Sequence, residues 1–295
     1  MLNMATEKEQ NMAKPDPSNT IAFMGVPGAN ADLACRQKYP YMQTLAVPSF
    51  EDVFTAVSEG KAALGMIPIE NSSAGRVAEI HQILPKMNLH IVSEHFQRIE
   101  HFLLAPKGAK LDTVKEVYSH PQALMQCRNS LQKLKLHPNS YSNTAKAAAD
   151  VAEWNDPAKA AIASPLAAEL YGLVCLKEHI EDAKDNVTVF VAISRELDYP
   201  PVGGKEKVLT TLLFTARNIP AALYKSLGGF ATNGVNIIKL ESYIPGGVSA
   251  AAQFFVTFEG HPEDRLVKLA MEELKFFCEK VTIIGVYPAD PERYK

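Results

Sequence analysis

The sequence predicts an α/β fold: two lobes of alternating strands and helices, followed by a smaller ferredoxin-like unit of βαββαβ order. Two observations predict this class. Short apolar runs alternate with helical patterns in two clusters, at about 21–98 and 99–185. A segment rich in proline, glycine and charge, DYPPVGGKEK, then separates these clusters from the remaining chain. Strands that alternate with helices form parallel or mixed sheets with crossover connections, so we expect one lobe for each cluster.

The first cluster opens with a short buried strand, 21–25, that leads into a turn of glycine and proline. Apolar residues at helical spacing, from Phe50 to Val57, predict a helix that ends at Gly60. The other expected elements of this cluster are, in order, a buried strand at 63–69, the polar run Glu70-Asn71-Ser72-Ser73, a helix through Val77, Ile80 and Leu84, and a strand at 89–92.

The second cluster repeats the pattern of strand, polar residues and helix. Its expected elements are, in order, a strand at 115–118 that ends in Ser119-His120-Pro121, a helix through Leu124, Cys127, Leu131 and Leu134, an alanine-rich helix capped by Asn143-Thr144, a strand at 160–163, and a helix capped by Ser164-Pro165. Serine and asparagine accept hydrogen bonds from the free N–H groups of a first helical turn. A later strand at 187–193 is expected to return to the first lobe and form a hinge.

The linker sets the domain boundaries. Residues 1–19 are polar and lack the apolar segment of a signal peptide, so they predict a disordered tail. The two-lobed domain is expected over 20–197. Its first lobe takes about 20–98 together with 187–197, and its second lobe takes 99–186. The linker is 198–207. Strands at 208–216, 235–244, 250–259 and 281–287, with helices at about 219–232 and 262–277, predict the βαββαβ unit over 208–288, before a C-terminal tail at 289–295. So small a unit needs a partner surface, and we expect a dimer or tetramer formed through it.

The composition argues against several classes of protein. Thirty basic against thirty-three acidic side chains leave a net charge of −3, without the excess of cations that nucleic-acid binding requires. The four cysteines, Cys35, Cys127, Cys175 and Cys278, lie far apart and form no CxxC pair, which argues against a zinc site or a disulfide framework. No apolar run approaches the ~20 residues of a membrane-spanning helix. We therefore expect a cytoplasmic protein that binds neither nucleic acid nor membrane.

Polar residues at the ends of the expected strands indicate where a ligand binds. In open α/β sheets, ligands bind beyond the carboxyl ends of the strands. These ends carry Gly25 and Gly28, the run 70–73, Ser119-His120 and Ser164. Several of them begin a helix, where free N–H groups favour an anion. Such a cleft suits a small molecule with more than one carboxylate, although each residue alone is also an ordinary helix cap.

Motifs of other chemistries are absent from the sequence. GVPG at Gly25 has neither the lysine of a phosphate-binding loop nor the third glycine of a dinucleotide fingerprint. There is no HExxH and no GxSxG. We therefore expect neither a metal nor a cofactor, and catalysis by positioning and electrostatics.

Five blocks of sequence together resemble the catalytic domain of prephenate dehydratases. They are IAFMGVPGANADLAC, FEDVFTAVSEGKAALGMIPIENSSAG, VYSHPQALMQCR, AAIASPLAAELYGL and DNVTVFVAIS, in this order. The later segments TARNIPAALYKSLGGFATNGVNIIKLESYIP, FFVTFEGH and VYP resemble the ACT regulatory domain of that family. The resemblance, over about 20–288, implies a two-lobed catalytic domain like a type II periplasmic-binding protein, with substrate in its cleft, and a ferredoxin-like ACT domain.

The resemblance implies an enzyme that converts prephenate, a dicarboxylate, to phenylpyruvate with loss of water and carbon dioxide and without a cofactor. Thr188 matches the family threonine that assists loss of the hydroxyl, and Asn71, Ser119 and Gln126 match polar residues that we assign to catalysis with it. The candidates for substrate binding are Glu70, Ser72, Gln122, His120, Ser164, Phe190 and Arg76. A free threonine hydroxyl is a poor acid, so this role requires a hydrogen-bond partner.

One departure from the family pattern concerns catalysis. The family motif Thr-Arg-Phe is Thr188-Val189-Phe190 here, so an aliphatic side chain replaces a cation, and Arg76 is the candidate substitute. The departure leaves alternatives open: an arogenate dehydratase, a hydrolase of another carbonyl ligand, or a sensor that kept the lobes and lost the chemistry. The retained Thr188 and Asn71 favour chemistry, because a sensor has no need of a leaving-group threonine.

A second departure concerns regulation. The family's phenylalanine-binding motifs, Gly-Ala-Leu-Val and Glu-Ser-Arg-Pro, are Ala221-Ala222-Leu223-Tyr224 and Glu241-Ser242-Tyr243-Ile244 here. The candidate effector-binding residues are Asn218, Ala221, Ala222, Leu223, Glu241 and Ser242. Glycine lets a backbone approach a ligand closely, and the methyl group of Ala221 obstructs this approach. We expect weak binding of phenylalanine between subunits, with another small amino acid, or dimerisation alone, as the alternatives.

Overall fold

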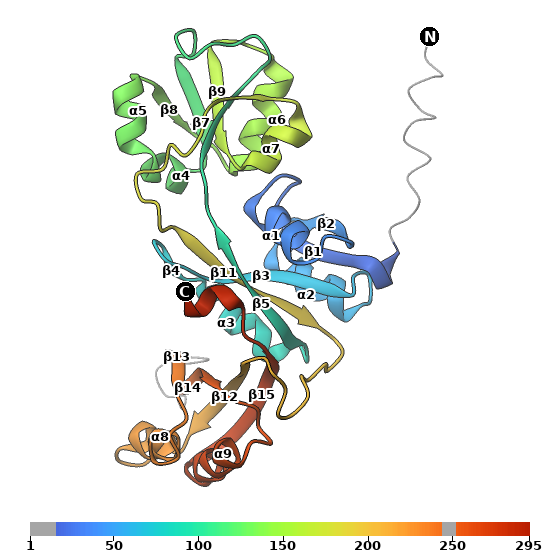
Figure 1. Cartoon of the computed structure of the whole chain (residues 1–295), viewed down its shortest axis with the longest axis vertical. Coiled ribbons are helices and arrows are strands. Elements are labelled where there is room, and N and C mark those ends of the chain that lie inside the picture. The colour runs from blue at the N-terminus through green and yellow to red at the C-terminus, as the bar shows by residue number, and fades with distance from the viewer. Residues whose placement is uncertain (1–15, 244–251) are drawn as a thin grey trace.

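The computed structural model describes residues 16–243 and 252–295, which form three units stacked along the long axis of the molecule (Figure 1). The first lobe lies in the middle, with the second lobe at one end and the ferredoxin-like unit at the other. This arrangement confirms the predicted fold class. Of the expected N-terminal tail, residues 1–15 lie outside the described residues, and 17–19 form a short 3₁₀ helix, η1 (Pro17–Asn19).

The first lobe is built on one half of a large sheet. Its strands are β1 (Thr20–Met24), β2 (Gln43–Val47), β3 (Leu64–Asn71), β4 (Gly75–Arg76), β5 (His90–Arg98) and β11 (Val187–Ser194), and its helices are α1 (Asn30–Lys38), α2 (Phe50–Ser58), α3 (Ala78–Ile83) and the 3₁₀ helix η2 (Leu84–Lys86). The strand order is β5-β11-β3-β1-β2, with β4 beside β3, and β11 is antiparallel to both its neighbours. Ser49 caps α2, whose predicted apolar residues are buried.

The second lobe has its own five-stranded sheet, in the order β10-β6-β9-β7-β8. Its elements are β6 (Phe102–Ala105), β7 (Glu116–Ser119), α4 (Pro121–Gln126), α5 (Arg128–Leu134), β8 (His137–Ser140), α6 (Thr144–Trp154), β9 (Lys159–Ala163), α7 (Pro165–Tyr171) and β10 (Val174–Lys177). Asn143 and Ser164 cap α6 and α7 with their side chains, as predicted. The single helix expected around Cys127 is two helices, because the Cys127 backbone (φ −112°, ψ 14°) leaves helical geometry between them.

The loop after β1 packs directly on the second lobe. Ser164 Oγ donates a 2.6 Å hydrogen bond to the Gly28 carbonyl, and the Tyr171 hydroxyl donates one of 2.6 Å to the Pro27 carbonyl. A Cβ at Gly28, whose φ is +85°, would lie 3.1 Å from the Cα of Ala167. The contact between the lobes therefore requires glycine at this position.

The third unit has the predicted βαββαβ order: β12 (Val208–Ala216), α8 (Ala222–Thr232), β13 (Ile237–Tyr243), β14 (Gln253–Glu259), α9 (Arg265–Phe277) and β15 (Cys278–Pro288). Its strands run in the order β13-β14-β12-β15, and all neighbours are antiparallel. The strands expected at 235–244 and 250–259 fall partly on 244–251, outside the described residues. The linker at 198–207 contains no helix or strand.

One continuous sheet joins the third unit to the first lobe. β15 pairs in parallel with β5, and Gly285 lies opposite Ile91. A Cβ at Gly285 would lie 2.4 Å from the Ile91 carbonyl oxygen, so only glycine permits this pairing. Ile91 also shares a hydrophobic core with Ile284 and Tyr287 of the third unit. The two units are therefore packed together in addition to being linked.

The last residues, expected as a tail, form a 3₁₀ helix, η3 (Pro291–Tyr294), that contacts both units. Arg293 donates from Nε (2.8 Å) and Nη2 (2.6 Å) to the carboxylate of Glu94 on β5. The Tyr294 hydroxyl donates a 2.7 Å hydrogen bond to Glu259 on β14. The segment 289–295 thus ties the first lobe to the third unit. Within the described residues, no helix is long and apolar enough to cross a membrane.

Candidate active site

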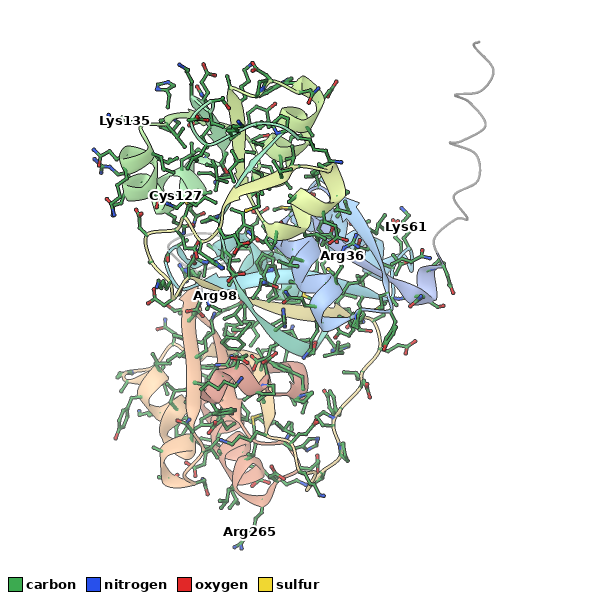
Figure 2. The ribbon with its side chains drawn as sticks, turned by 45° about the horizontal axis from the view of Figure 1, so that its top comes forward. Arg36, Lys61, Arg98, Cys127, Lys135 and Arg265 are labelled. Atoms are coloured by element: carbon green, nitrogen blue, oxygen red, sulfur yellow. The ribbon has the colours of Figure 1, made fainter. Side chains whose placement is uncertain are left out.

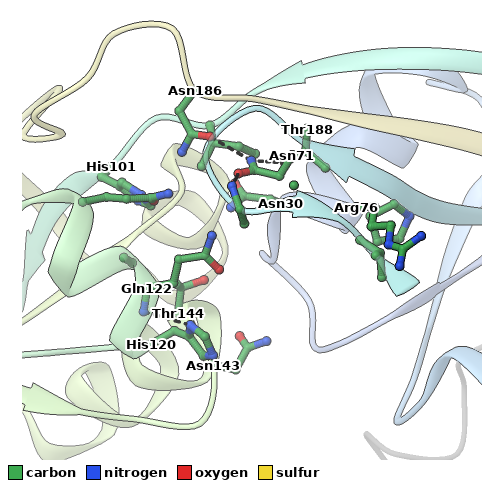
Figure 3. A pocket seen from close by; sticks show the side chains of 17 residues that line it. Asn30, Asn71, Arg76, His101, His120, Gln122, Asn143, Thr144, Asn186 and Thr188 are labelled. Carbon is green, nitrogen blue, oxygen red and sulfur yellow. Dashed lines mark hydrogen bonds between the residues drawn. The ribbon is translucent and has the colours of Figure 1, made fainter. Parts of the chain in front are cut away.

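A cavity of about 300 Å³ lies between the two lobes (Figure 3). Its walls come from the end of β3 and the start of β11 in the first lobe and from the starts of α4 and α6 in the second. Six side-chain amides line it: Asn30, Asn71, Gln122, Gln126, Asn143 and Asn186. None of the described residues that line it is acidic, and no three His, Cys, Asp or Glu side chains are grouped as metal ligands anywhere in the described part of the chain. Such a wall favours an anionic ligand.

Thr188 and Asn71 are hydrogen-bonded at the first-lobe wall. Asn71 Nδ2 donates to Thr188 Oγ1 at 2.9 Å and to Asn186 Oδ1 at 2.8 Å. Asn71 Oδ1 accepts from the backbone N–H groups of Ser73 (3.0 Å) and Ala74 (2.8 Å), so both ends of the amide are held. Because Thr188 Oγ1 accepts this hydrogen bond, its own proton remains available for donation into the cavity.

Strand register brings these two residues together. β11 pairs with β3 so that Thr188 lies opposite Asn71. The next residue, Ser72, donates its backbone N–H to the Val187 carbonyl at 2.9 Å, and its Oγ accepts from the Val187 N–H at 3.0 Å. Ser72 Oγ also donates to the Asp185 carbonyl at 3.1 Å. The turn after β3 is therefore fastened to the entry of β11.

The second lobe contributes two histidines and two glutamines to the opposite wall (Figure 3). His101 Nε2 lies 2.8 Å from Gln126 Oε1, and the His101 backbone N–H donates to Glu181 Oε2 at 2.9 Å. His120 caps α4, where its Nδ1 accepts from the Gln122 N–H at 3.2 Å. Burial lowers the pKa of His101, and the hydrogen bond to Gln126 and the Glu181 charge oppose this only in part. His101 is thus neutral at physiological pH.

The pKa of His101 predicts a pH dependence of stability. Its pKa in the folded state lies below the ordinary 6.5. As the pH falls through 6.5, this histidine therefore binds a proton in the unfolded chain before it does so in the folded protein. The free energy of unfolding should therefore decrease on acidification, with a slope of at most about 1.4 kcal/mol per pH unit for this group. Urea unfolding at pH 7.5 and 5.5 should show a smaller decrease for His101→Gln than for the wild type. The exposed His137 of β8 gives the control variant, His137→Gln, and an equal decrease in both variants would contradict the prediction.

The cavity wall contains six of the predicted site residues: Asn71, Arg76, His120, Gln122, Gln126 and Thr188. Ser119 and Ser164 are buried behind it, and their hydroxyls donate to the carbonyls of Ile162 and Gly28, both at 2.6 Å. A buried hydroxyl needs such a partner, and here a neighbouring backbone provides it. These two serines, like Ser72, support the wall from outside the cavity.

Two further predicted residues point elsewhere. Phe190 is 3% exposed and packs in the core with Phe23 and Met66. Glu70 faces the third unit, where its Oε2 lies 2.9 Å from Lys239 Nζ. Neither lines the cavity, because successive residues of a strand face opposite sides of the sheet and the strands bulge at this point.

The cavity also contains five polar residues that sequence reasoning did not select: Asn30, His101, Asn143, Thr144 and Asn186. Asn30 Oδ1 is buried and has no hydrogen-bond partner among the described residues, so it is poised to accept from a ligand. Asn143 was predicted only as a helix cap, and Asn186 stands two residues before Thr188. The sequence offers no comparable signal for His101, which lies between two strands.

Comparison with known proteins identifies the family. Residues 21–198 match the profile of prephenate dehydratases. The chain belongs to the prephenate dehydratase family. This confirms the resemblance drawn from the five sequence blocks.

Three relatives show how far the similarity extends within the family. A bifunctional N-acyl-homoserine lactone acylase/prephenate dehydratase of Komagataeibacter europaeus is 48% identical over 276 residues, covering 93% of this chain and 98% of that protein. The chloroplastic arogenate dehydratase/prephenate dehydratase 2 of Arabidopsis thaliana is 34% identical over 298 residues, covering 98% of this chain and 76% of that protein. The solved structure of the Arthrobacter aurescens prephenate dehydratase in complex with L-Phe has a TM-score of 0.83 and 29% identity, covering 93% of this chain and 91% of that one.

Val189, which stands where the family motif has arginine, and Arg76, the candidate substitute, both lie away from the cavity centre. Val189 packs against the first-lobe core, opposite Glu70 on β3 and Phe96 on β5. Arg76 lies at the cavity rim, apart from the histidines (Figure 3). Its Nη1 donates to the Ser242 carbonyl at 3.3 Å and lies 3.7 Å from Glu241 Oε2. The candidate substitute therefore turns toward the third unit.

The effector-binding segments expected from the family lie at the start of α8 and the end of β13. Asn218 and Ala221 are exposed before α8, and Ala222 and Leu223 form its first turn. Ala221 has φ 60° and ψ 29°, the left-handed conformation that favours glycine. Glu241 Oε1 lies 3.1 Å from Lys239 Nζ.

Proposed function

We propose that this chain is a prephenate dehydratase of phenylalanine biosynthesis that acts in the cytoplasm. The observation that carries the proposal is the hydrogen bond from Asn71 to Thr188, which leaves the threonine proton available to a leaving group. Membership of the family and a cavity wall without acidic residues support the same reaction.

In the proposed reaction, Thr188 donates its proton to the ring hydroxyl of prephenate as the C–O bond breaks, and water leaves. The ring carboxylate departs as carbon dioxide, and the electron pair of its C–C bond completes the aromatic ring of phenylpyruvate. Thr188 regains its proton from solvent. Asn71 stabilises the negative charge on Thr188 Oγ1 during the transfer, because its amide is already oriented by Ser73 and Ala74.

The cavity amides are suited to the two carboxylates of the substrate. Asn30, Gln122 and Asn143 stand at or near the starts of α1, α4 and α6. The helix dipole favours negative charge there, and α1 has no side-chain cap on its first-turn N–H groups. Neutral His101 adds a hydrogen-bonding group to the cavity. Because it carries no charge, it does not hold back the ring carboxylate that leaves as carbon dioxide.

The direct test is to mix the purified protein with prephenate and to follow phenylpyruvate by its absorbance. Arogenate, the aminated analogue, is assayed in parallel with phenylalanine as the product. Turnover of prephenate supports the proposal. Turnover of arogenate alone would replace it by an arogenate dehydratase function, an activity in the name of the Arabidopsis relative. Turnover of neither substrate would contradict a dehydratase function.

A second candidate activity is hydrolysis of N-acyl-homoserine lactones, which the name of the 48% identical Komagataeibacter relative favours. The test is release of the fatty acid from such a lactone, followed by mass spectrometry. If the activity uses the same cavity, Thr188→Ala and prephenate itself should both reduce it. Absence of fatty acid from the wild type would dismiss this candidate.

Regulation by phenylalanine is proposed at the third unit, through which we also propose a dimer or tetramer. The solved complex of the Arthrobacter aurescens prephenate dehydratase with L-Phe supports phenylalanine as the ligand. Phenylalanine would contact the start of α8 and the carboxylate of Glu241, and it would inhibit if it binds more tightly to one arrangement of the lobes than to another. Light scattering on the protein with and without phenylalanine tests the assembly.

The conformation of Ala221 predicts that glycine is favoured there. Ala221→Gly should raise the free energy of unfolding by about 0.5–1 kcal/mol, because it relieves the left-handed strain of a side chain. It should also tighten phenylalanine binding in calorimetric titration. The neighbouring Ala222→Gly is the control: Ala222 begins α8, so glycine there should lower stability. Equal signs for the two variants would refute the prediction.

A further inference from the structure

Four charged side chains meet where the third unit touches the first lobe, and we call them the junction cluster: Glu70, Arg76, Lys239 and Glu241. Lys239, on β13, is its central cation. Its Nζ lies 2.9 Å from Glu70 Oε2 and 3.1 Å from Glu241 Oε1, and its side chain is only 13% exposed. One ammonium group is thus shared by two carboxylates, one from each unit.

Glu70 of the junction cluster is adjacent to Asn71, which with Thr188 forms the proposed catalytic pair. Glu70 is the residue before Asn71 on β3, and the two side chains face opposite sides of the sheet. In the strand register, Glu70 is paired with Val189 on β11 and with Arg76 on β4. Val189 is aliphatic and Arg76 is turned to Glu241 and Ser242. The cation at Glu70 is therefore Lys239, which comes from 169 residues away in the chain.

We propose that Lys239 is a positioning residue for the reaction, an inference that rests on the proposed function. By binding Glu70 it fixes the end of β3, and with it the direction in which Asn71 holds Thr188. Without the ammonium, the carboxylates of Glu70 and Glu241 would repel each other across the junction, because like charges at close range are unfavourable where water is partly excluded. The third unit thereby contributes to catalysis in the absence of any effector.

The inference predicts a loss of turnover with substrate binding largely retained. Lys239→Met keeps an unbranched side chain one atom shorter and removes the charge. It should lower kcat about tenfold, because small misplacements of a catalytic group cost rate. KM should change by less than about twofold, since Lys239 touches no substrate. Lys239→Arg keeps the charge and should restore most of the rate. Lys280→Met, which removes an exposed lysine from β15, should match the wild type.

A second measurement does not depend on activity. Amide hydrogen exchange of residues 70–76 should be faster in Lys239→Met than in Lys280→Met, because the end of β3 loses the ion pair of Glu70 with β13. Glu70→Gln removes the other partner of the same ion pair and should also speed exchange in residues 70–76. This second variant tests the inference even if Lys239→Met does not fold.

The outcomes separate this inference from the proposed function. Wild-type kcat and wild-type exchange in Lys239→Met would overturn the inference while the function stands. If the wild type turns over neither prephenate nor arogenate, the proposed function fails, and exchange alone decides whether Lys239 positions the end of β3. Equal losses of kcat in Lys239→Met and Lys239→Arg would also overturn it, because the charge would then be irrelevant.

Discussion

Thr188→Ala is expected to lower kcat for prephenate by about 10²–10³-fold, the contribution typical of a positioned proton donor. The physical reason is that Thr188 Oγ1 is the hydroxyl that Asn71 orients toward the cavity, at 2.9 Å from Nδ2. Alanine removes this donor and leaves the Asn71 amide with its partner Asn186. Steady-state kinetics, followed by phenylpyruvate absorbance, measure the effect.

Two variants control this experiment. Thr188→Ser retains a hydroxyl and should keep most of the rate, although its side chain is less restricted in rotation. Thr282→Ala removes an exposed threonine from β15, far from the cavity, and should leave kcat unchanged. Circular dichroism and the unfolding midpoint establish that each variant is folded. Turnover of Thr188→Ala within threefold of the wild type would remove Thr188 from the mechanism.

Arg293→Ala is expected to lower the free energy of unfolding by about 3–5 kcal/mol, because it leaves a buried charge without its partner. Glu94 is 1% exposed, and both its oxygens accept from the Arg293 guanidinium, at 2.8 and 2.6 Å. Among the described residues, the Asp290 N–H, at 2.9 Å, also donates to this carboxylate, but it cannot replace a cation. The loss should appear in urea unfolding as a lower midpoint.

A matched arginine and a double variant sharpen this test. Arg265 projects from the end of the molecule, on α9 (Figure 2), and Arg265→Ala should change stability by less than about 0.5 kcal/mol. Glu94→Gln combined with Arg293→Ala removes both charges and should be less destabilised than Arg293→Ala alone. A loss below about 1 kcal/mol in Arg293→Ala would mean that η3 is not essential to the packing of the first lobe.

The elements that could be predicted are those with strong local patterns. The apolar stripe of α2 and the caps Asn143 and Ser164 are encoded in consecutive residues, so the sequence alone locates them. β8 was missed, because its sequence His-Pro-Asn-Ser resembles a turn. It is a strand since β7 offers it a parallel partner. The predicted helix through Cys127 is two helices because the Cys127 backbone leaves helical geometry, a break that the apolar spacing does not predict.

By itself, the sequence determined the fold class and the family, and it selected Thr188 and Asn71 as catalytic candidates, because short contiguous blocks carry them. Only the tertiary structure decided that Thr188 and Asn71 share a hydrogen bond while Ser119 and Ser164 turn to backbone carbonyls. It alone joined the third unit to the first lobe through Gly285 and brought Lys239 to Glu70. The physical reason is the same in each case. A side chain's partner is set by strand register and by the packing of segments far apart in the chain, whereas periodicity and motifs report only on near neighbours.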